Sequence, residues 1–500
     1  YSHCDYQSMS TTSAKLPKSA VVIGGGFIGI SSAIHLCSRG FAVTVLEKAR
    51  SGVGSKKDGE CASYGNAGTF APYATFGLND DSPASLLTAG VKAFFGGSLM
   101  FGSTKSGDGD VANPLSFSLS ASNASEVMKF AMHFLRNSSA ENRVKTNEGL
   151  SELCKRASSS WKETLRLAGV NDARAFLEEH ANRNGYLLLT KSRFDSKEAI
   201  EKNEERKRLL GDKNIWNHEG EGELIGPEMC KQLEPNLTDS AVANGGVYFK
   251  DAWSLRAPDV FLKKLAEFAL KMKGPLGGSV VIKAGSSGEV VDVRGEQQND
   301  EKAEIVTKSG DVYTNVHTIV VCSGWRSKEI AKMCGDGDIP LIAERGYSVE
   351  FSDTEQVSPS KLLTRATCFQ RGGFIISPLQ SRLRAAGLVE FGPDQPPTAS
   401  NLLSLESSTR KLLRNFSDAP PRNKNSDWLG GRPTLPDYLP VLSRSSAKSN
   451  VIYAFGHQHI GFTLAGITGK IVADIATTTS SQQQGDDHFP LEPYAVQRFL

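Results

Sequence analysis

Residues 19–29 read SAVVIGGGFIG, a short apolar and β-branched run followed by a glycine-rich turn. Residues 30–40 then read ISSAIHLCSRG, a pattern typical of a helix that ends at Gly40. A second strand is predicted over residues 41–46, and Glu47 follows it directly. A strand, a GxGxxG turn, a helix, a strand and an acidic residue in this order are typical of a fold that binds a dinucleotide.

Three glycines of this unit have separate physical roles. Gly24 permits the tight turn, Gly26 lets the backbone approach a pyrophosphate, and Gly29 lets the helix lie close to the strand. The pyrophosphate meets unpaired amides at the helix N-terminus, and Glu47 accepts hydrogen bonds from the adenosine ribose. NAD and FAD both use this unit, so the rest of the chain has to distinguish them. We place its cofactor contacts at Gly24, Gly26, Phe27, Ile28, Gly29, Glu47 and Lys48.

Composition excludes several classes of protein. The chain has 500 residues, and its net charge of +2, from 57 Lys and Arg against 55 Asp and Glu, does not fit a protein that coats nucleic acid. The 8 cysteines are scattered without a CxxC pair, which argues against a disulfide framework and a metal site. The most apolar window, residues 19–36, is interrupted by glycines, serines and His35, so no transmembrane segment is expected. Residues 1–18 have no apolar core and are expected to form a flexible leader.

Further small-residue turns occur much later in the chain. The run CASYGNAG at 61–68 allows close packing against a phosphate and a flat ring. A buried-type strand over 318–321 leads into CSGW at 322–325, and another over 451–455 leads into GHQHIG at 456–461 and a helix from about Thr463. Because these turns are hundreds of residues apart, they imply a sheet built from distant segments, with cofactor contacts at several strand ends.

Together these segments resemble the FAD-dependent amine and amino-acid oxidoreductases of the D-amino-acid oxidase superfamily, most closely its bacterial-type D-amino-acid dehydrogenase branch. The resemblance runs from about Ser19 to the C-terminus. Its carriers are VVIGGGFIG at 21–29, SYGNAG at 63–68, ERGYS at 344–348, RLRAAGLVE at 382–390, WLGGRPTLPDYLPVL at 428–442 and GHQHIGFTLAGITGKIVADI at 456–475. The chain departs from the family at Gln458, where Gly is frequent, and in an enlarged loop over residues 96–125.

The resemblance implies FAD as the cofactor. No cysteine or histidine stands where some relatives attach their flavin, so the FAD is expected to be non-covalent. The helix that begins near residues 461–463 is expected to direct its N-terminal amides at the flavin carbonyl edge, where reduction builds negative charge. Beyond the first unit, the expected cofactor contacts are Ser63, Asn66, Ala67, Gly68, Val290, Ser323, Gly324, Trp325, Gly456, Gly461, Phe462 and Thr463.

The resemblance also implies the residues that meet the substrate. Arg432, in GGRP, corresponds to the family arginine that binds the substrate carboxylate, and a guanidinium matches a carboxylate in two parallel hydrogen bonds. Tyr347 borders the pocket and either donates its hydroxyl to the carboxylate or closes the pocket, although a half-buried strand tyrosine is an equal alternative. His457 and His459 flank the flavin-facing turn and are expected to point in different directions. A positioning role is favoured for them over proton abstraction.

The implied fold is α/β, with a Rossmann-like FAD-binding domain of the glutathione-reductase type interleaved with an α+β substrate domain on a mainly antiparallel sheet. The FAD-binding domain is expected at 19–79, 227–338 and 426–476, the substrate-binding domain at 80–226 and 339–425, and a C-terminal tail at 477–500. Helical patterns are present over 150–167, 196–210 and 258–272.

The expected reaction is the FAD-dependent oxidative deamination of D-amino acids to 2-oxo acids and ammonia, by hydride transfer from the α-carbon to flavin N5. Dioxygen, a quinone or a protein accepts the electrons. Two alternatives stay open: an oxidase or dehydrogenase of secondary amines of the sarcosine, glycine, D-proline or hydroxyproline type, and a non-catalytic flavoprotein. A nucleic-acid partner is not expected, and peripheral membrane contact stays open. A soluble intracellular protein, cytoplasmic or mitochondrial, is favoured.

Overall fold

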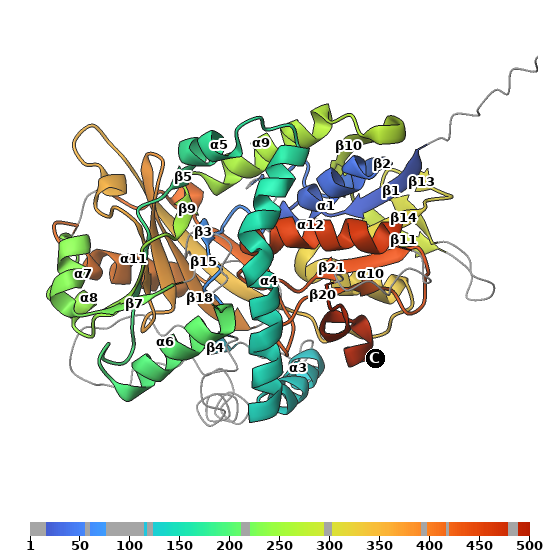
Figure 1. Cartoon of the computed structure of the whole chain (residues 1–500). Coiled ribbons are helices and arrows are strands. Elements are labelled where there is room, and N and C mark those ends of the chain that lie inside the picture. The colour runs from blue at the N-terminus through green and yellow to red at the C-terminus, as the bar shows by residue number, and fades with distance from the viewer. Residues whose placement is uncertain are drawn as a thin grey trace, which may run out of the picture.

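The computed structural model describes most of the chain, in two large sheets with helices around them (Figure 1). The described residues are 17–55, 61–76, 115–117, 124–211, 221–294, 303–391, 398–416, 420–478 and 489–500. Most of the expected leader at 1–18 and of the enlarged loop at 96–125 therefore lies outside the described residues.

The first sheet has 6 strands, and its spatial order departs from the order in the chain. The order is β10 (Ser279–Ala284), β2 (Phe41–Glu47), β1 (Lys18–Ile23), β14 (Thr318–Val321), β21 (Val451–Phe455) and β20 (Val441–Arg444). All neighbours pair in parallel except β20, which is antiparallel to β21. Strands from three distant parts of the chain thus lie side by side, as the Rossmann-like interpretation requires.

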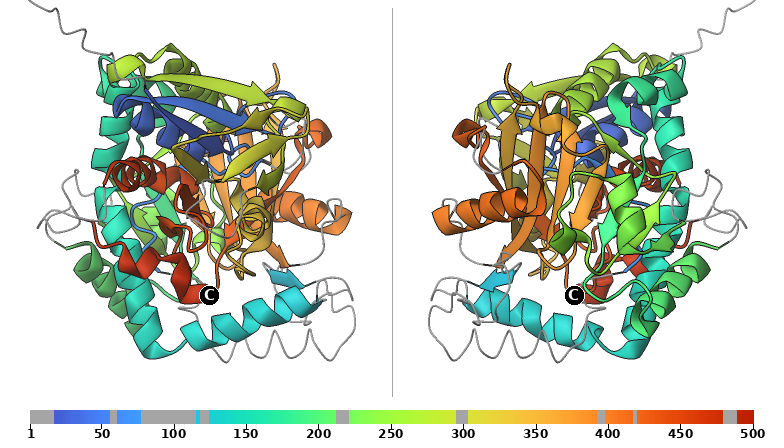
Figure 2. Two further views of the ribbon diagram at one scale, coloured as in Figure 1. Left: turned by 90° about the vertical axis from the view of Figure 1, so that its right-hand side faces the viewer. Right: turned by 90° about the vertical axis from the view of Figure 1, so that its left-hand side faces the viewer.

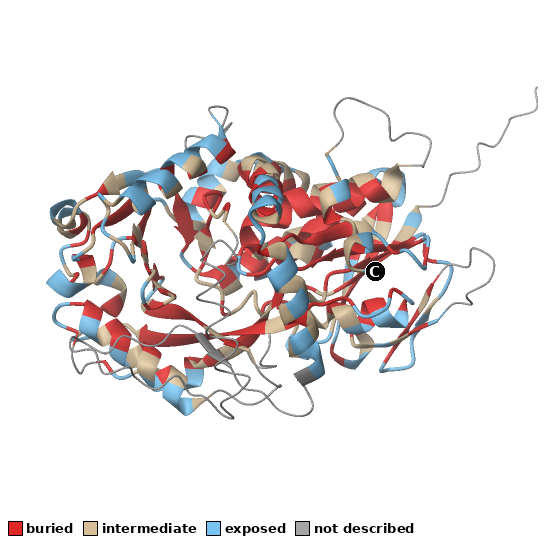
Figure 3. Ribbon diagram, turned by 90° about the horizontal axis from the view of Figure 1, so that it is seen from below, coloured by how far each residue is buried: buried red, intermediate tan, exposed pale blue. Residues whose placement is uncertain are grey.

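Both faces of this sheet are covered, which explains why its strands are almost uniformly apolar. One face carries α1 (Phe27–Ser38), α12 (Gly461–Thr477), α4 (Ala140–Leu167), α9 (Pro258–Lys271) and α5 (Ala173–His180). The other carries α10 (Ser327–Met333) and a small antiparallel sheet of β11 (Val290–Arg294), β12 (Glu304–Thr307) and β13 (Val312–Tyr313). Along β1, Ala20 and Val22 face the first layer, and Val21 and Ile23 face the second. Buried strands under partly exposed helices are visible in Figure 3.

The second sheet has 9 strands and is mainly antiparallel. Its order is β19 (Trp428–Thr434), β15 (Ile342–Ser352), β18 (Arg382–Phe391), β17 (Phe374–Leu379), β16 (Ala366–Phe369), β6 (Tyr186–Leu189), β8 (Gly246–Phe249) and β7 (Glu223–Ile225), with β4 (Leu115–Phe117) beside β18. One face packs under α11 (Ala399–Leu412), the orange helix in Figure 2, and the other faces the Rossmann-like domain. The remaining elements are α3 (Ala124–Asn137), α6 (Lys197–Leu210), α7 (Pro227–Leu233), α8 (Asp239–Val242) and a small sheet of β3 (Thr69–Phe70), β9 (Trp253–Leu255) and β5 (Ala181–Asn182).

This arrangement confirms the predicted fold class, a Rossmann-like domain joined to a mainly antiparallel sheet. The predicted domain boundaries remain predictions. Two strands inside the segments expected in the FAD-binding domain belong to the second sheet by hydrogen bonding, since β8 pairs with β6 and β19 pairs along β15. In the expected C-terminal tail, Tyr494 is buried and donates its hydroxyl to the Gly149 carbonyl at 2.8 Å. Among the described residues, no helix is both long and apolar enough to cross a membrane.

A buried guanidinium links the second sheet to the loop that follows β2. Arg384 on β18 has no exposed surface, and it donates from Nε and Nη2 to the Glu350 carboxylate at 2.8 and 2.6 Å. Its Nη1 donates to the carbonyls of Tyr64 and Asn66 at 2.9 and 2.7 Å. Because a buried charge without partners is very costly, these bonds fix the loop against the sheet.

We expect Arg384→Met to lower the free energy of unfolding by about 3 kcal/mol, because the buried Glu350 carboxylate loses two charged hydrogen bonds and the carbonyls of Tyr64 and Asn66 lose this donor. Arg382→Met is the matched control, since Arg382 donates to the same Glu350 oxygen but keeps part of its side chain in water. Chemical denaturation of both variants measures the difference. A loss for Arg384→Met no larger than that for Arg382→Met would contradict the assigned link.

A buried histidine makes the contact between α1 and α4 sensitive to acid. The ring of His35 shares a hydrogen bond with Thr164 Oγ1 at 2.9 Å, and burial lowers the pKa of His35 to about 3. The unfolded chain therefore takes up this proton below about pH 6.5 while the folded chain does not, so stability falls as the pH falls. We expect the loss of stability between pH 7.5 and pH 5 to be about 2 kcal/mol smaller in His35→Gln than in the wild type. Denaturation curves at the two pH values test this, and equal losses would refute it.

Candidate functional site

A large cavity lies between the carboxyl ends of the parallel strands and the second sheet, on the face of that sheet opposite α11. Its volume is about 1350 Å³, above the range of about 300–1000 Å³ typical of small-molecule pockets. The walls come from the turns after β1, β2, β14 and β21, from the loop at 61–71, and from β15, β18 and β19. The cavity thus has room for a dinucleotide and a small substrate together.

The turn after β1 has the geometry that a pyrophosphate site needs. Gly24 has φ +112°, and a Cβ on Gly29 would overlap the Gly24 carbonyl oxygen, so only glycine lets α1 lie this close. The N-cap residue of α1 is Gly26, which has no side chain and therefore leaves the first turn of the helix without a side-chain cap from this position. Glu47, at the end of β2, accepts hydrogen bonds from the Gly25 amide at 2.7 Å and the Ala49 amide at 2.9 Å. These residues fit the diphosphate and ribose of an adenine dinucleotide.

The other predicted cofactor contacts come together at the same cavity. Those that line it are Gly24, Gly26, Phe27, Ile28, Glu47, Lys48, Ser63, Asn66, Ala67, Val290, Ser323, Gly324, Trp325, Gly461 and Phe462. Gly29, Gly68 and Gly456 lie behind this wall, where each meets neighbouring backbone or side chains. Thr463 does not line the cavity, and its hydroxyl accepts a hydrogen bond from the Ala71 amide at 2.9 Å. Their roles in binding a cofactor stay predictions.

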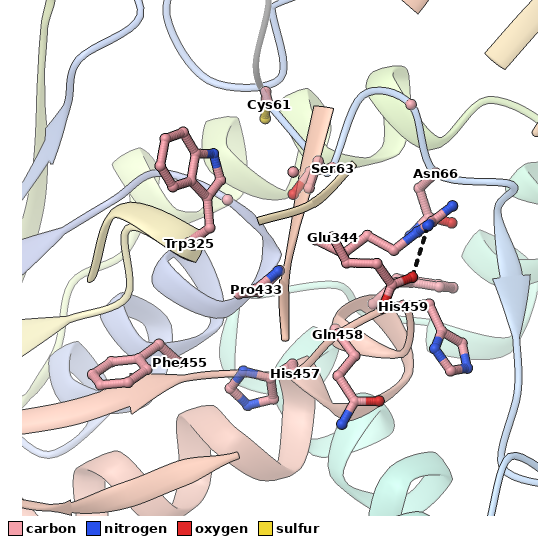
Figure 4. Close-up of a pocket in the computed structure, with 18 of the residues that line it drawn as sticks. Cys61, Ser63, Asn66, Trp325, Glu344, Pro433, Phe455, His457, Gln458 and His459 are labelled. Carbon is pink, nitrogen blue, oxygen red and sulfur yellow. Dashed lines mark hydrogen bonds and ion pairs between the residues drawn. The ribbon is translucent and has the colours of Figure 1, made fainter. Parts of the chain in front are cut away.

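Arg432 lies on β19 opposite Glu344 on β15, and the two residues are partners in the strand register. Arg432 Nη1 donates to Glu344 Oε1 at 2.9 Å and to the Leu388 carbonyl at 2.9 Å. The Arg432 side chain keeps 19% of its surface exposed, and both residues line the cavity. Figure 4 shows the Glu344 carboxylate and its hydrogen-bonded guanidinium at the cavity wall. The guanidinium therefore stands where a ligand carboxylate can reach it.

Tyr347 lies in a different setting from Arg432, although it also lines the cavity. Its ring is part of the apolar cluster under α11, and its hydroxyl donates to the Glu390 carboxylate. Burial, with Glu390 adding to it, raises the pKa of Tyr347. Glu390 also pairs with Arg345 at 3.1 Å. Because the Tyr347 hydroxyl already donates its hydrogen bond to Glu390, this structure supports a wall-forming role for Tyr347 more directly than a donor role toward a substrate.

The two histidines after β21 point in different directions (Figure 4). The ring of His457 is buried and shares a hydrogen bond with Thr468 Oγ1 of α12 at 2.9 Å, and burial lowers the pKa of His457 to about 3. His459 exposes its ring to the cavity. Its depth in the protein lowers the pKa of His459, while Glu344 opposes and Arg432 adds to that shift. Gln458 between them has φ +50°, a left-handed conformation that explains why glycine suits this position.

Two residues of this site were missed in the sequence. Glu344 is part of the ERGYS motif, and the two-residue period of a strand places it on the face opposite Arg345 and Tyr347. That alternation was the available signal. Arg384 positions the loop that carries Ser63 and Asn66, but the two loop carbonyls that it binds are more than 300 residues away in the chain, and no local pattern identifies it. No cluster of three or more potential metal ligands occurs among the described residues.

Known proteins share this sequence pattern and this fold. The chain is 27% identical over 486 residues to a D-amino-acid oxidase of Bradyrhizobium diazoefficiens, covering 96% of this chain and 98% of that protein. It is 26% identical over 474 residues to a D-amino acid dehydrogenase of Vibrio atlanticus, covering 93% and 98%. The solved structure of glycine oxidase from Geobacillus kaustophilus superposes with a TM-score of 0.63 at 17% identity over 97% of this chain and 99% of the other. That of L-proline dehydrogenase from P. horikoshii gives 0.62 at 18% identity over 97% and 98%.

The model of one family spans nearly the whole chain. The FAD dependent oxidoreductase family DAO matches residues 19–475, from the first strand of the Rossmann-like domain into the last turn of α12. The glycine turn, the Glu47 carboxylate and the size of the cavity fit the FAD that this family uses. The chain is therefore an enzyme of the DAO family of FAD-dependent oxidoreductases.

Proposed function

We propose that this enzyme oxidises the carbon–nitrogen bond of D-amino acids and yields 2-oxo acids and ammonia. The relatives that align along almost the whole chain are named for D-amino-acid oxidation or dehydrogenation. The observation that carries the proposal is Arg432, whose guanidinium is partly exposed in the cavity and bound to the protein through Nη1. A carboxylate that binds its other edge gains two parallel, charge-assisted hydrogen bonds.

The residues around Arg432 suit the binding and orientation of a small amino acid. Arg432 holds the carboxylate, and His459 offers a neutral imidazole to the same part of the cavity. Phe130 and Phe134 of α3 and Phe391 of β18 form an apolar wall that can receive a side chain and exclude water. FAD supplies the hydride acceptor when it is bound. The residues of this chain then promote the reaction mainly by positioning the substrate beside the flavin, and this role needs no strong base.

Anaerobic titration of the purified enzyme tests the proposal. The panel contains D-phenylalanine, D-leucine and D-alanine, with D-proline, sarcosine and glycine as the secondary-amine and achiral alternatives. Bleaching of the flavin by the D-amino acids supports the proposal, and bleaching only by secondary amines or glycine replaces it with the alternative. No bleaching by any member would indicate a non-catalytic flavoprotein. Reoxidation by air or by a quinone then identifies the class of electron acceptor.

We expect acid or heat to release the flavin from the purified protein as FAD. Neither the NAGT segment at 66–69 nor the RPTLPD segment at 432–437 contains a cysteine or a histidine that could form a covalent flavin bond. Chromatography of the supernatant identifies the flavin. FMN in the supernatant, or flavin that stays with the precipitated chain, would contradict non-covalent FAD.

Replacement of Gly26 by leucine should abolish FAD binding with little loss of stability of the protein without cofactor. A Cβ at Gly26 lies 3.1 Å from Ser63 Oγ and extends into the space we assign to the pyrophosphate. Flavin content per chain and the thermal midpoint measured without FAD separate a blocked site from misfolding. A variant that keeps its flavin would remove this assignment.

Arg432→Ala should lower kcat/KM for a D-amino acid by roughly 30-fold to several thousand-fold, equivalent to about 2 to 5 kcal/mol, because the substrate carboxylate loses its charged partner. Arg432→Lys keeps the charge but loses the two-point geometry, so its loss is intermediate. The matched control is the amine that lacks the carboxylate, on which both variants should act as the wild type does. Equal losses on both substrates, at equal FAD occupancy, would mean that Arg432 supports the fold or the flavin instead.

A further inference from the structure

Glu344 is the acidic residue in direct contact with Arg432, and its environment is more restricted than that of its partner. Only 3% of the Glu344 side chain is exposed, against 19% for Arg432. Glu344 Oε1 accepts from Arg432 Nη1 at 2.9 Å, and Glu344 Oε2 accepts from the Thr434 hydroxyl at 3.0 Å. Because both oxygens are engaged, the carboxylate is held in one orientation.

The guanidinium of Arg432 binds the protein through one of its nitrogen atoms and leaves its opposite edge available to a ligand. A Cβ on Gly346 would overlap the guanidinium, which therefore lies flat on the strand at that glycine. Nη1 makes the contacts to Glu344 and to the Leu388 carbonyl, while Nε and Nη2 donate to no residue within the described ranges. The Nε–Nη2 edge has the geometry of a carboxylate fork. A ligand carboxylate thus binds an arginine that already has one carboxylate partner.

The charge balance around Arg432 determines which ligands suit this site. In the protein alone, Glu344 and Arg432 together are neutral. The depth of His459 in the cavity lowers the pKa of its imidazole below the ordinary value, so this ring adds no positive charge at neutral pH. The other charged side chains of the cavity wall are Glu47, Lys48, Lys191, Glu289, Arg326 and Glu329. Arg326 belongs to a turn that packs on β19, where Trp325 lies against Gly431, but it has its own acidic partner in Glu329 at 3.8 Å. Lys191 follows β6, which three strands separate from β15. A carboxylate without a cation therefore leaves one uncompensated negative charge at Arg432, and charge without a partner is costly away from water.

We propose that Glu344 is a specificity-determining residue that makes this site select ligands carrying an ammonium group beside the carboxylate and disfavour plain carboxylates. An amino acid in its zwitterionic form leaves the local charge at zero, whereas the corresponding carboxylic acid anion does not. Glu344 acts through Arg432 and through local charge. The inference rests on the proposed function, because it takes Arg432 as the carboxylate site.

Matched ligands test this selection without turnover. 2-Aminoisobutyrate and 2-methylpropanoate share one carbon skeleton and differ in the amino group, and the first has no α-hydrogen to lose. Their dissociation constants for the FAD-loaded enzyme follow from the change in flavin absorbance. We expect the wild type to bind 2-aminoisobutyrate at least ~10-fold more tightly. A wild type that binds both alike, or prefers 2-methylpropanoate, overturns the proposal whatever the variants do.

Glu344→Gln keeps the shape of the side chain and removes its charge. We expect the ratio of the two dissociation constants to shift by at least ~10-fold toward 2-methylpropanoate. Thr434→Val is the matched control, because it removes the other hydrogen bond to Glu344 without changing any charge. Its ratio should stay that of the wild type. Equal weakening of both ligands in Glu344→Gln would assign a structural role to Glu344 and reject the proposal.

The anaerobic titration keeps this test separate from the proposed function. If amino acids bleach the flavin but the ligand ratio does not respond to Glu344→Gln, only the selection by Glu344 is wrong. If no amino acid bleaches the flavin and neither ligand perturbs its spectrum, the proposed function is wrong and the selection falls with it.

Discussion

The contact on which the site depends most is the buried ion pair of Arg384 and Glu350. Arg384 uses one side of its guanidinium for Glu350 and the other for the carbonyls of Tyr64 and Asn66. These bonds fix the position of the loop after β2 relative to the second sheet, and both contribute to the wall of the cavity. A loose arrangement would leave a charge unpaired in the interior, so the cost of desolvation enforces the geometry.

The two sides of the cavity divide the chemistry between them. The Rossmann-like side presents backbone amides and glycine turns at the ends of parallel strands, which suit a cofactor that many oxidoreductases share. The side formed by the second sheet presents Arg432 and Glu344 on adjacent strands, with the apolar wall of α3 nearby. Under the proposed function, substrate selection depends on the sheet, and cofactor binding depends mainly on the Rossmann-like domain.

Elements with a complete local pattern were predicted closely. The strands expected at 318–321 and 451–455 are β14 and β21 with the same bounds, because a short buried run between turns is recognised from its own residues. Helix α4 was predicted from residue 150 but begins at Ala140, where Ser139 caps it by accepting a hydrogen bond from the Asn142 amide. Its first turns are largely exposed and polar, so they carry no apolar period.

The sequence by itself determined the cofactor class, the glycine turn with Glu47, and the presence of Arg432 in the GGRP motif, to which we assign carboxylate binding. Each of these depends on residues that are close together in the chain or on a motif with a known order. The tertiary structure alone decided that β8 and β19 join the second sheet, that Tyr347 donates to Glu390, and that Glu344 pairs with Arg432. Tyr347 and Glu390 are 43 residues apart, and Glu344 and Arg432 are 88 residues apart. Each pair joins two different strands, and only the register of the folded sheet brings the partners within hydrogen-bonding distance.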